Sequence, residues 1–353
     1  MTSTQRLPPS LTPVDAALAA LLRDVGPVVV RASAERQQGA AVEVPELKSW
    51  PPHDIAATDG WALRASDLVA ASSYTPLPLA KPPVWVEAGD QIPHGCDCVI
   101  DEDSVDLTGP IVQALAEAIP GQGVRRKGGA IADPSRIVDA WRPGDLAACR
   151  PRVRVLNVPG GNITVSLVAN GLRESGANVA FVEAAARDAT SIGQLLDVSG
   201  CDLLIIVGGS GVGRTDASVI ALAAHGVVIA HGLALRPGRA AAVGRIGQMP
   251  VVIVPGAPDQ ALAVWWTIVL PVLDRLAARQ RGTLTLPLAR KIASSVGIAE
   301  VVLLRREQGA WMPLAVGDLP FEVIARADAW LLVAGDSEGY AAGTPADAYL
   351  LRE

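Results

Sequence analysis

The sequence predicts a multidomain α/β protein with a central doubly wound, mostly parallel sheet, flanking small β-domains and an elongated N-terminal part. Half of the 353 residues are hydrophobic and 19% are charged, which excludes a disordered chain. Residues 151–280 alternate short apolar runs with helical patterns, as repeated β-α-β units do. The regions on both sides hold short strands between turn signals. We therefore divide the chain into an elongated domain (1–48 with 121–150), a small β-domain (49–120), an α/β domain (151–280) and a C-terminal small β-domain (281–353).

The expected elements follow from apolar periodicity. A helix follows Pro13, with Thr12 as its N-cap, because apolar residues recur on one helical face up to Val25. The expected strands lie at 82–86, 98–100, 153–158, 178–182, 203–207, 227–230, 251–254, 301–305, 321–325 and 330–333. The expected helices of the α/β domain lie at 167–175, 190–198, 216–225 and 258–279.

Charge and composition exclude several classes of protein. Acidic residues outnumber basic ones by 36 to 30, so the chain lacks the general attraction for phosphate backbones that nucleic-acid binders use. The first ten residues hold no signal-peptide core, and the longest apolar run (261–273) is shorter than the ~20 residues that span a bilayer. The four cysteines match neither a disulfide framework nor a zinc motif. We expect a cytoplasmic protein with reduced thiols and with no membrane or nucleic-acid partner.

The sharpest motif is the glycine-rich segment 207–216, which separates a buried apolar run from a helical pattern. Glycines there let backbone N–H groups approach an anion at a helix N-terminus, although a tight turn that binds nothing is the alternative. Four glycines in six residues exceed what a plain turn requires. The spacing matches neither the Rossmann nor the Walker pattern. The candidate binding residues are Gly208, Gly209, Ser210, Gly211 and Gly213.

Two further loops follow later strands of the same predicted sheet. One places two guanidinium groups around a Pro-Gly turn as a compact anion clamp, and the other ends a strand with a second Pro-Gly pair. Ligands of open α/β sheets bind at the carboxyl ends of the strands, so the loops together predict a phosphorylated small molecule that bears a pyrophosphate. The candidate residues of the two loops are Arg236, Pro237, Gly238, Arg239, Pro255 and Gly256.

Candidates in the N-terminal half carry less information by themselves. Asp59 precedes a glycine turn, for which an ordinary Asp-Gly turn is the alternative. Asp103 belongs to the acidic cluster 101–103, which is either a metal site or a solvated turn. Arg125 and Arg126 form a local basic patch that is either exposed charge or a second anion contact. The four histidines lack metal-ligand spacing, and no nucleophile elbow supports a hydrolytic triad.

Five motifs in order resemble the MoeA family, the molybdopterin molybdenumtransferases that include the gephyrin E domain. The matches run from Asp59 to about Trp265, over half of the chain, and Asp103 falls where the family has an acid. The matching segments, each followed by the family's motif, are 58–64 (M-D-G-Y-A-V-R), 88–97 (T-G-A-x-x-P-x-G-x-D/E), 208–216 (G-G-V-S-V-G-x-x-D), 236–239 (K-P-G-K) and 255–258 (P-G-N-P).

This resemblance implies an elongated four-domain protein that forms a homodimer. Members of the family bind adenylylated molybdopterin, insert molybdate at its dithiolene and cleave the pyrophosphate with Mg²⁺. The resemblance implies that Asp59 and Asp216 are catalytic, that Asp59, Asp103 and Asp216 bind Mg²⁺, and that the glycine and arginine loops bind molybdopterin. The expected protein partner is a molybdopterin adenylyltransferase or a molybdoenzyme.

Several family acids are missing, which keeps the activity open. Residues 157–161 read N-V-P-G-G where the family has S-T-G-D-E, and residues 128–131 read G-G-A-I where it has G-E-D-I. Because Mg²⁺ takes oxygen ligands, fewer carboxylates weaken metal-assisted cleavage. Three hypotheses follow: a divergent molybdenumtransferase, a molybdopterin-binding carrier without metal insertion, and a structural dimer without a ligand.

Overall fold

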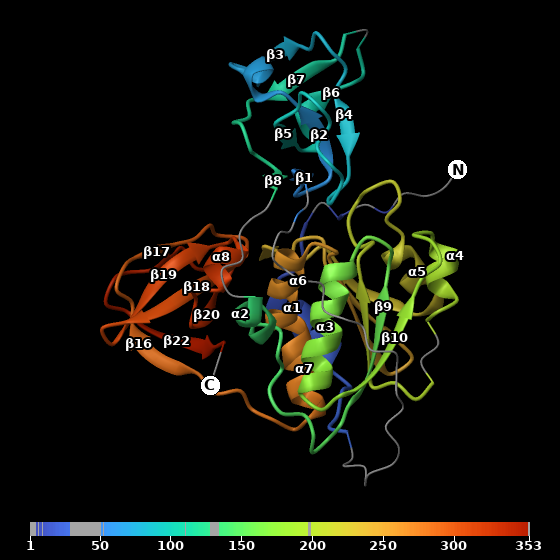
Figure 1. The fold of residues 1–353 in the computed structure, drawn as a ribbon, viewed down its shortest axis with the longest axis vertical. Helices are drawn as coiled ribbons and strands as arrows, with labels where there is room; N and C mark the ends of the chain where they lie inside the picture. The colour runs from blue at the N-terminus through green and yellow to red at the C-terminus, as the bar shows by residue number, and fades with distance from the viewer. Residues whose placement is uncertain are drawn as a thin grey trace. The chain divides into compact units, whose positions relative to one another are not determined.

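The computed structural model describes residues 10–28, 53–109, 111–127, 134–196 and 199–351, together with Gln5, Leu7, Pro8 and Pro51. The chain forms two compact units, one of Glu46–Ile131 and one that combines Met1–Pro45 with Ala132–Glu353 (Figure 1). The division into four domains stays a prediction. Residues 128–131, where the resemblance places acids, lie outside the described residues.

A six-stranded sheet forms the centre of the larger unit. Its strands are β9 (Arg152–Asn157), β10 (Asn178–Glu183), β11 (Leu203–Val207), β12 (Val227–His231), β14 (Ala242–Ile246) and β15 (Met249–Val254). They lie in the order β10-β9-β11-β15-β14-β12, of which the first four are parallel and the last two add antiparallel pairings. All five residues of β11 are buried, as expected for a short apolar strand in the middle of a parallel sheet.

Helices cover both faces of this sheet, so it is doubly wound as predicted (Figure 1). The helix α3 and the chain from α6 to α7 cover one face, whereas α4 and α5 pack on Leu204 and Ile206 of β11 on the other. The helices of the larger unit so far are α1 (Val14–Leu22), α3 (Asn162–Glu174), α4 (Ala189–Gly193), α5 (Ser218–His225), α6 (Pro258–Val264), the π-helical turn η4 (Trp265–Val269) and α7 (Leu270–Leu276).

The helix α1 begins where the sequence predicts it, but the expected capping role of Thr12 is wrong. Pro13 occupies the N-cap position, and no side chain caps the helix. Thr12 instead pairs with the segment after β12: its N–H donates to the oxygen of Gly232 over 2.9 Å, and its oxygen accepts from the N–H of Ala234 over 2.7 Å. This main-chain pairing holds Thr12 in an extended bridge and fastens the N-terminal segment to the edge of the sheet.

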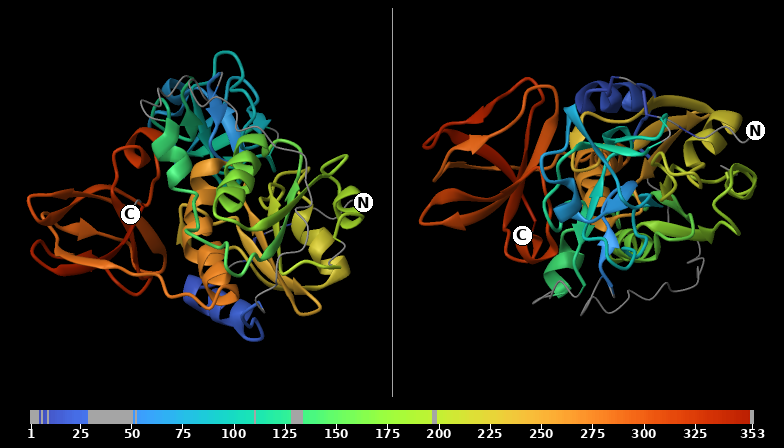
Figure 2. Two further views of the ribbon diagram at one scale, coloured as in Figure 1. Left: turned by 60° about the horizontal axis from the view of Figure 1, so that its bottom comes forward. Right: turned by 90° about the horizontal axis from the view of Figure 1, so that it is seen from above.

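The C-terminal part of the larger unit forms a second layer of strands (Figure 2). These strands are β13 (Leu235–Arg236), β16 (Leu284–Pro287), β18 (Ala299–Glu307), β19 (Ala310–Val316), β20 (Ala329–Val333) and β22 (Pro345–Leu350). Their order is β13-β18-β20-β22-β16, with β19 on β18, and a separate pair joins β17 (Ile292–Ala293) to β21 (Gly339–Tyr340). Through β13, the arginine loop enters this second sheet.

The expected strand at 321–325 is wrong, because these residues form the short helix α8 (Phe321–Ile324). The carbonyl oxygen of Pro320 accepts from the N–H groups of Val323 and Ile324, each over 2.9 Å. Phe321 and Ile324 are both buried, and their spacing of three is helical rather than alternating. The helix α8 contacts α2 (Pro134–Asp139).

The smaller unit consists of short strands in small sheets. They are β1 (Ile55–Ala56), β2 (Gly60–Leu63), β3 (Ser72–Pro78), β4 (Val84–Val86), β5 (Cys98–Ile100), β6 (Val105–Asp106), β7 (Gln113–Ala116) and β8 (Val124–Arg125), with the 3₁₀ turns η2 (Ala65–Leu68) and η3 (Glu102–Ser104). The sheets are β4-β2-β5, β3-β7-β6 and β1-β8. The strands predicted at 82–86 and 98–100 are confirmed as β4 and β5. No helix in the described ranges is long and apolar enough to cross a bilayer.

Candidate functional site

The candidate site lies at the carboxyl ends of the parallel strands β9, β11 and β15. From β9 the chain passes through α3 to β10 on one side, whereas β11 lies on the other side of β9. Open α/β sheets bind ligands in the crevice outside such a reversal of strand order. The loops after β9 and β11 therefore frame the position at which this fold holds a ligand.

Three glycine-containing loops meet at this edge. A Cβ atom placed on Gly256, after β15, would lie 3.7 Å from Cα of Gly208 and 3.9 Å from Cα of Gly161. The hydroxyl of Thr164, in the first turn of α3, donates to the oxygen of Gly256 over 2.6 Å. This bond links the helix that follows the Gly161 loop to the Gly256 loop. The predicted proximity of the Gly208 and Gly256 loops is therefore observed.

Glycine is required at the start of the loop after β11. Gly208 and Gly209 have φ angles of +93° and +66°, in the region that side chains rarely adopt. A Cβ on Gly209 would lie only 2.4 Å from Oγ of Ser218. That hydroxyl donates to the oxygen of Gly208 over 2.8 Å, so the first turn of α5 packs directly on the glycines.

The loop leaves consecutive N–H groups available at the sheet edge. Across the part of the chain that the structure describes, the N–H groups of Gly209, Ser210 and Gly211 have no hydrogen-bond acceptor. Ser210 is nevertheless buried. Consecutive backbone N–H groups beside a helix N-terminus form a site for an anion such as a phosphate.

The opposite side of the loop is held by Gln5, which sequence reasoning missed. Its side-chain amide donates to the main-chain oxygen of Gly209 over 2.8 Å and also to that of Gly211. Its side-chain oxygen accepts from the N–H of Val219 over 3.3 Å. Gln5 is 5% exposed, so these bonds are shielded from water. No local pattern marks this residue, because the loop it contacts lies more than 200 positions away.

Asp216, a predicted catalytic and metal-binding residue, is engaged by two donors. Arg187 donates to Oδ1 over 2.9 Å, and the N–H of Gly213 donates to Oδ2 over 3.1 Å. The other end of the Arg187 guanidinium donates to the oxygen of Pro159 over 3.3 Å. Arg187 therefore links the loops after β9 and β11, and sequence reasoning missed it because no motif surrounds it.

The three predicted Mg²⁺ ligands belong to two different units of the chain, and their joint metal site stays a prediction. Asp59 belongs to the smaller unit and accepts the N–H of Ala88 over 2.8 Å. Asp103 lies exposed in η3. Each oxygen of Asp216 already accepts from an N–H donor, and one of these donors is the cationic guanidinium of Arg187, which disfavours a metal ion beside it. Within the described ranges, no group of three or more His, Cys, Asp or Glu side chains is placed to hold a metal ion. The residues at the sheet edge of the larger unit therefore do not by themselves fit a resident Mg²⁺.

Asn157, at the end of β9, brings a buried hydrogen-bond acceptor to the same place. Its Nδ2 group donates to Oδ1 of Asn162 over 3.0 Å and to Oε1 of Glu183 over 3.4 Å, which fixes the orientation of the amide. Its Oδ1 atom is buried, has no partner among the described residues, and would lie 3.1 Å from a Cβ on Gly161. A ligand or a water molecule with an N–H or O–H group satisfies this acceptor.

The two arginines of the predicted clamp differ in their surroundings. Arg236 lies opposite Glu300 across β13 and β18 and contacts its Oε1 over 3.4 Å. Glu300 is buried and also accepts from the hydroxyl of Ser294 over 2.7 Å. Arg239 is exposed, and its guanidinium has no partner among the residues that the structure places. Of the two arginines, Arg239 is therefore the better candidate to bind an anion.

Gly238 brings this arginine loop against α6. A Cβ on Gly238 would lie 3.0 Å from Cγ2 of Val264 and 3.3 Å from the oxygen of Gln260. Pro237 precedes it, and Pro255 and Gly256 precede α6 itself. The predicted arginine loop (236–239) and the predicted Pro255-Gly256 loop therefore both contact α6.

His231 connects the end of β12 to the glycine loop. The strand β12 runs in the same direction as β15, since β14 is antiparallel to both, so its carboxyl end lies at the same edge. The Nε2 atom of His231 lies 2.9 Å from the oxygen of Ser210, and because a carbonyl only accepts, Nε2 carries the proton. Burial lowers the pKa of His231, although this hydrogen bond opposes the change.

The basic patch of the smaller unit is occupied within that unit. Arg126 contacts Oδ2 of Asp54 over 3.0 Å, and Arg125 lies in β8. The N–H of Lys127 and the Arg126 guanidinium lower the pKa of Asp54. Arg126 is exposed and paired with Asp54 in this structure, and a role as an anion contact stays a prediction.

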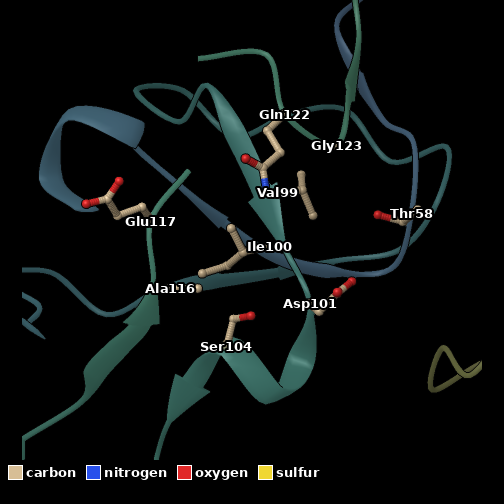
Figure 3. A pocket seen from close by; sticks show the side chains of 9 residues that line it. All are labelled: Thr58, Val99, Ile100, Asp101, Ser104, Ala116, Glu117, Gln122 and Gly123. Carbon is tan, nitrogen blue, oxygen red and sulfur yellow. The ribbon is translucent and has the colours of Figure 1, made fainter. Parts of the chain in front are cut away.

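A pocket of about 220 Å³ lies in the smaller unit, formed by β5, η3 and the end of β7 (Figure 3). Its polar residues include Asp101 and Glu117, and Oε1 of Glu117 accepts the N–H of Ala70 over 2.8 Å. Carboxylates repel phosphate, and none of the predicted site residues lines this pocket. It is therefore not the predicted anion site.

The fold is that of an α/β protein whose glycine-containing loops meet at a strand switch point, and the comparisons identify its family. The profile of the MoeA N-terminal region (domains I and II) matches residues 12–143, and that of a probable molybdopterin-binding domain matches residues 160–275. The chain belongs to the MoeA family, whose role is molybdenum cofactor biosynthesis.

Individual relatives cover most of the chain. The chain is 25% identical over 311 residues to molybdopterin molybdenumtransferase 2 of Mycobacterium tuberculosis. This alignment covers 72% of this chain and 76% of that protein. The MoeA protein of Pyrococcus horikoshii superposes with a TM-score of 0.53 at 21% identity, over 98% of this chain and 100% of that one. A molybdenum cofactor biosynthesis protein of Pyrococcus furiosus gives a TM-score of 0.51 at 17% identity, over 96% and 99%. These structures confirm the predicted multidomain α/β fold.

Proposed function

We propose that this chain binds molybdopterin, free or adenylylated, at the carboxyl ends of β9, β11 and β15. The observation that carries the proposal is the convergence of the Gly161, Gly208 and Gly256 loops at the point where the strand order reverses. The ligand's phosphate meets the N–H groups of Gly209, Ser210 and Gly211. The N–H groups of the pterin ring match the buried Oδ1 acceptor of Asn157.

The reaction that follows binding has two candidates. The family profiles and the names of the relatives support the insertion of molybdate with cleavage of the pyrophosphate. The ion pair of Asp216 with Arg187 supports the other candidate, a carrier that binds molybdopterin without inserting metal, because it occupies the retained acid. We favour the carrier on this observation.

A binding and turnover experiment separates these candidates. Purified protein is mixed with molybdopterin or adenylylated molybdopterin, binding is followed by the pterin fluorescence, and AMP release is measured after addition of molybdate and Mg²⁺. Binding without AMP release supports the carrier, and AMP release with cofactor formation supports the transferase. No binding of either form would contradict the proposal.

The clamp offers a matched pair of variants for this experiment. Arg239→Ala removes the unpartnered guanidinium at the α6 loop, and Arg290→Ala removes an exposed arginine on the turn between β16 and β17. We expect Arg239→Ala to weaken molybdopterin binding about tenfold and Arg290→Ala to leave it unchanged. Equal affinity in both variants would place the ligand elsewhere.

We also propose that the protein is a homodimer and that it exchanges molybdopterin with an adenylyltransferase or a molybdoenzyme. The support is the family to which the chain belongs. Light scattering coupled to size-exclusion chromatography measures the mass in solution, and a value near 36.5 kDa would contradict the dimer.

A further inference from the structure

We propose that Arg187 acts as the resident cation of this site and that the ligand's phosphate is bound without a divalent metal ion. This inference rests on the proposed function for the location of the ligand, but it concerns the charge that recognises the phosphate. It follows from the disagreement between the acids expected at a Mg²⁺ site and the residues that the structure places at the sheet edge.

The position of Arg187 is fixed by contacts with two loops. One end of its guanidinium donates to the oxygen of Pro159 in the loop after β9, over 3.3 Å. The other end donates to Oδ1 of Asp216 in the loop after β11, over 2.9 Å. The side chain is 33% exposed, so the cation is held in place and remains accessible to a ligand.

The loop after β9 leaves room for this guanidinium because residue 160 is glycine. A Cβ on Gly160 would lie 3.1 Å from Nη1 of Arg187, which is tighter than ordinary contact, and Gly160 has a φ angle of +107°. A side chain at this position would be strained by the positive φ angle and would make the guanidinium of Arg187 shift by a few tenths of an ångström. The local sequence thus favours a cation here over a carboxylate.

The acids near this point already accept hydrogen bonds, and Asp216 is also paired with a cation. Asp216 receives Arg187 at one oxygen and the N–H of Gly213 at the other, and it is 7% exposed. Glu183, at the end of β10, receives Nδ2 of Asn157 at 3.4 Å. Removing Arg187 from Asp216 to admit Mg²⁺ would cost this buried carboxylate its cationic partner, which the metal ion would have to replace.

A guanidinium and backbone N–H groups are together sufficient to recognise a phosphate. Arginine offers a planar fork of donors that matches phosphate oxygens, and it stays charged at any physiological pH. Gly213, whose N–H holds Asp216, belongs to the same loop as the unpartnered N–H groups of Ser210 and Gly211. Asp216 therefore connects the cation to the loop that carries these N–H groups.

The test uses inorganic phosphate as the probe, followed by its ³¹P NMR line in buffers that contain either EDTA or Mg²⁺. We expect the wild-type protein to bind phosphate equally in both buffers. We expect Arg187→Ala to weaken binding about tenfold or more in EDTA, and Arg187→Lys to restore part of the loss. Arg142→Ala serves as the matched control, because it removes another arginine of an ion pair, with Glu174 on the surface.

Asp216→Asn distinguishes a phosphate site formed by Arg187 from a metal-dependent site, because the two predict opposite changes in phosphate affinity. The amide oxygen still accepts from a donor, but the negative charge beside Arg187 is gone, so we expect phosphate to bind more tightly. A metal site would lose affinity with the same substitution. Loss of binding in EDTA by the wild type, wild-type affinity in Arg187→Ala, or weaker binding by Asp216→Asn would each overturn the inference.

The experiments can support or contradict the role of Arg187 independently of the proposed binding of molybdopterin. Metal-independent phosphate binding that depends on Arg187, without any binding of molybdopterin, would keep this inference and contradict the proposed ligand. Molybdopterin binding that requires Mg²⁺ would keep the proposed ligand and contradict this inference.

Discussion

The side-chain amide of Gln5 donates a hydrogen bond of 2.8 Å to the main-chain oxygen of Gly209, 204 positions further along the chain. The same amide bonds to Gly211 and to the first turn of α5, so this side chain, together with the N–H of Ser218 on the oxygen of Gly209, orients the loop's peptide groups. Because the oxygens of Gly209 and Gly211 are turned toward Gln5, the loop's N–H groups remain available to a ligand. The N-terminal segment is therefore part of the candidate site.

Replacement of Gln5 tests this dependence. Gln5→Ala leaves the oxygen of Gly211 and the N–H group of Val219 without a partner, whereas the oxygen of Gly209 still accepts from the N–H of Ser218 over 3.0 Å. We expect the substitution to lower the free energy of unfolding by about 2 kcal/mol. Gln5→Glu should lower it further, because a carboxylate then faces two carbonyl oxygens. Urea denaturation measures both changes. Gln5→Met keeps the length of the side chain and is the control for packing; equal stability of Gln5→Met and the wild type would show that the hydrogen bonds contribute nothing.

Gly209→Ala tests whether the loop requires glycine for space as well as for its backbone angle. Gly209 and Gly247 have similar φ angles, +66° and +58°, but a Cβ on Gly209 would contact Oγ of Ser218 at 2.4 Å and one on Gly247 would contact nothing within 4 Å. We expect Gly247→Ala to cost about 1 kcal/mol of stability and Gly209→Ala clearly more. Thermal unfolding of the two variants gives the comparison, and equal costs would refute the close contact.

Local patterns were sufficient for the elements that frame the candidate site. The apolar, β-branched run Leu203–Val207 is buried over its full length, and its bounds agree with the prediction. The Pro-Gly pair before α6 likewise ends β15 as expected. In both cases the residues that determine where the element begins or ends are adjacent in the sequence, so a local pattern is enough to predict it.

Elements whose cause lies elsewhere in the chain were missed. The strand β14 contains Gly244 and Arg245 and is held by antiparallel pairing on both sides, so no local apolar run marks it. The strand β13 exists only because it pairs with β18, more than 60 residues later. The site contacts of Gln5 and Arg187 are of the same kind, since each depends on a tertiary neighbour that periodicity does not encode.

The two arginines of the predicted clamp should separate stability from binding. Arg236→Ala removes a partner of the buried carboxylate of Glu300, and we expect a loss of about 1 kcal/mol in the free energy of unfolding, reduced by the exposure of Arg236. Arg239→Ala should leave stability unchanged and weaken the binding of molybdopterin. Urea denaturation and fluorescence titration of both variants measure this split. A stability loss in Arg239→Ala as large as that in Arg236→Ala would contradict it.

The stack of Trp266 on Trp330 should determine how firmly the C-terminal strands are fastened to the α/β part of the larger unit. The two rings lie 5.2 Å apart and 9° from parallel, and both side chains are buried. We expect Trp330→Ala to cost about 3–5 kcal/mol and Trp330→Phe considerably less. Hydrogen exchange of β20 and β22 reports the loss. Unchanged exchange in Trp330→Ala would show that other contacts hold this sheet.

The contact of His231 with Ser210 should make the stability of the glycine loop depend on pH. Burial lowers the pKa of this imidazole in the folded protein from its ordinary value of 6.5, so the unfolded chain takes up a proton at a higher pH than the folded one does. The stability that this residue contributes is therefore fully present above pH 6.5 and is lost as the pH falls through the lower folded-state pKa. We expect urea denaturation to show a steeper fall of stability below pH 6.5 for the wild type than for His231→Gln, whose neutral amide donates to the same oxygen. Parallel profiles of the two proteins would show that His231 does not titrate with a lowered pKa.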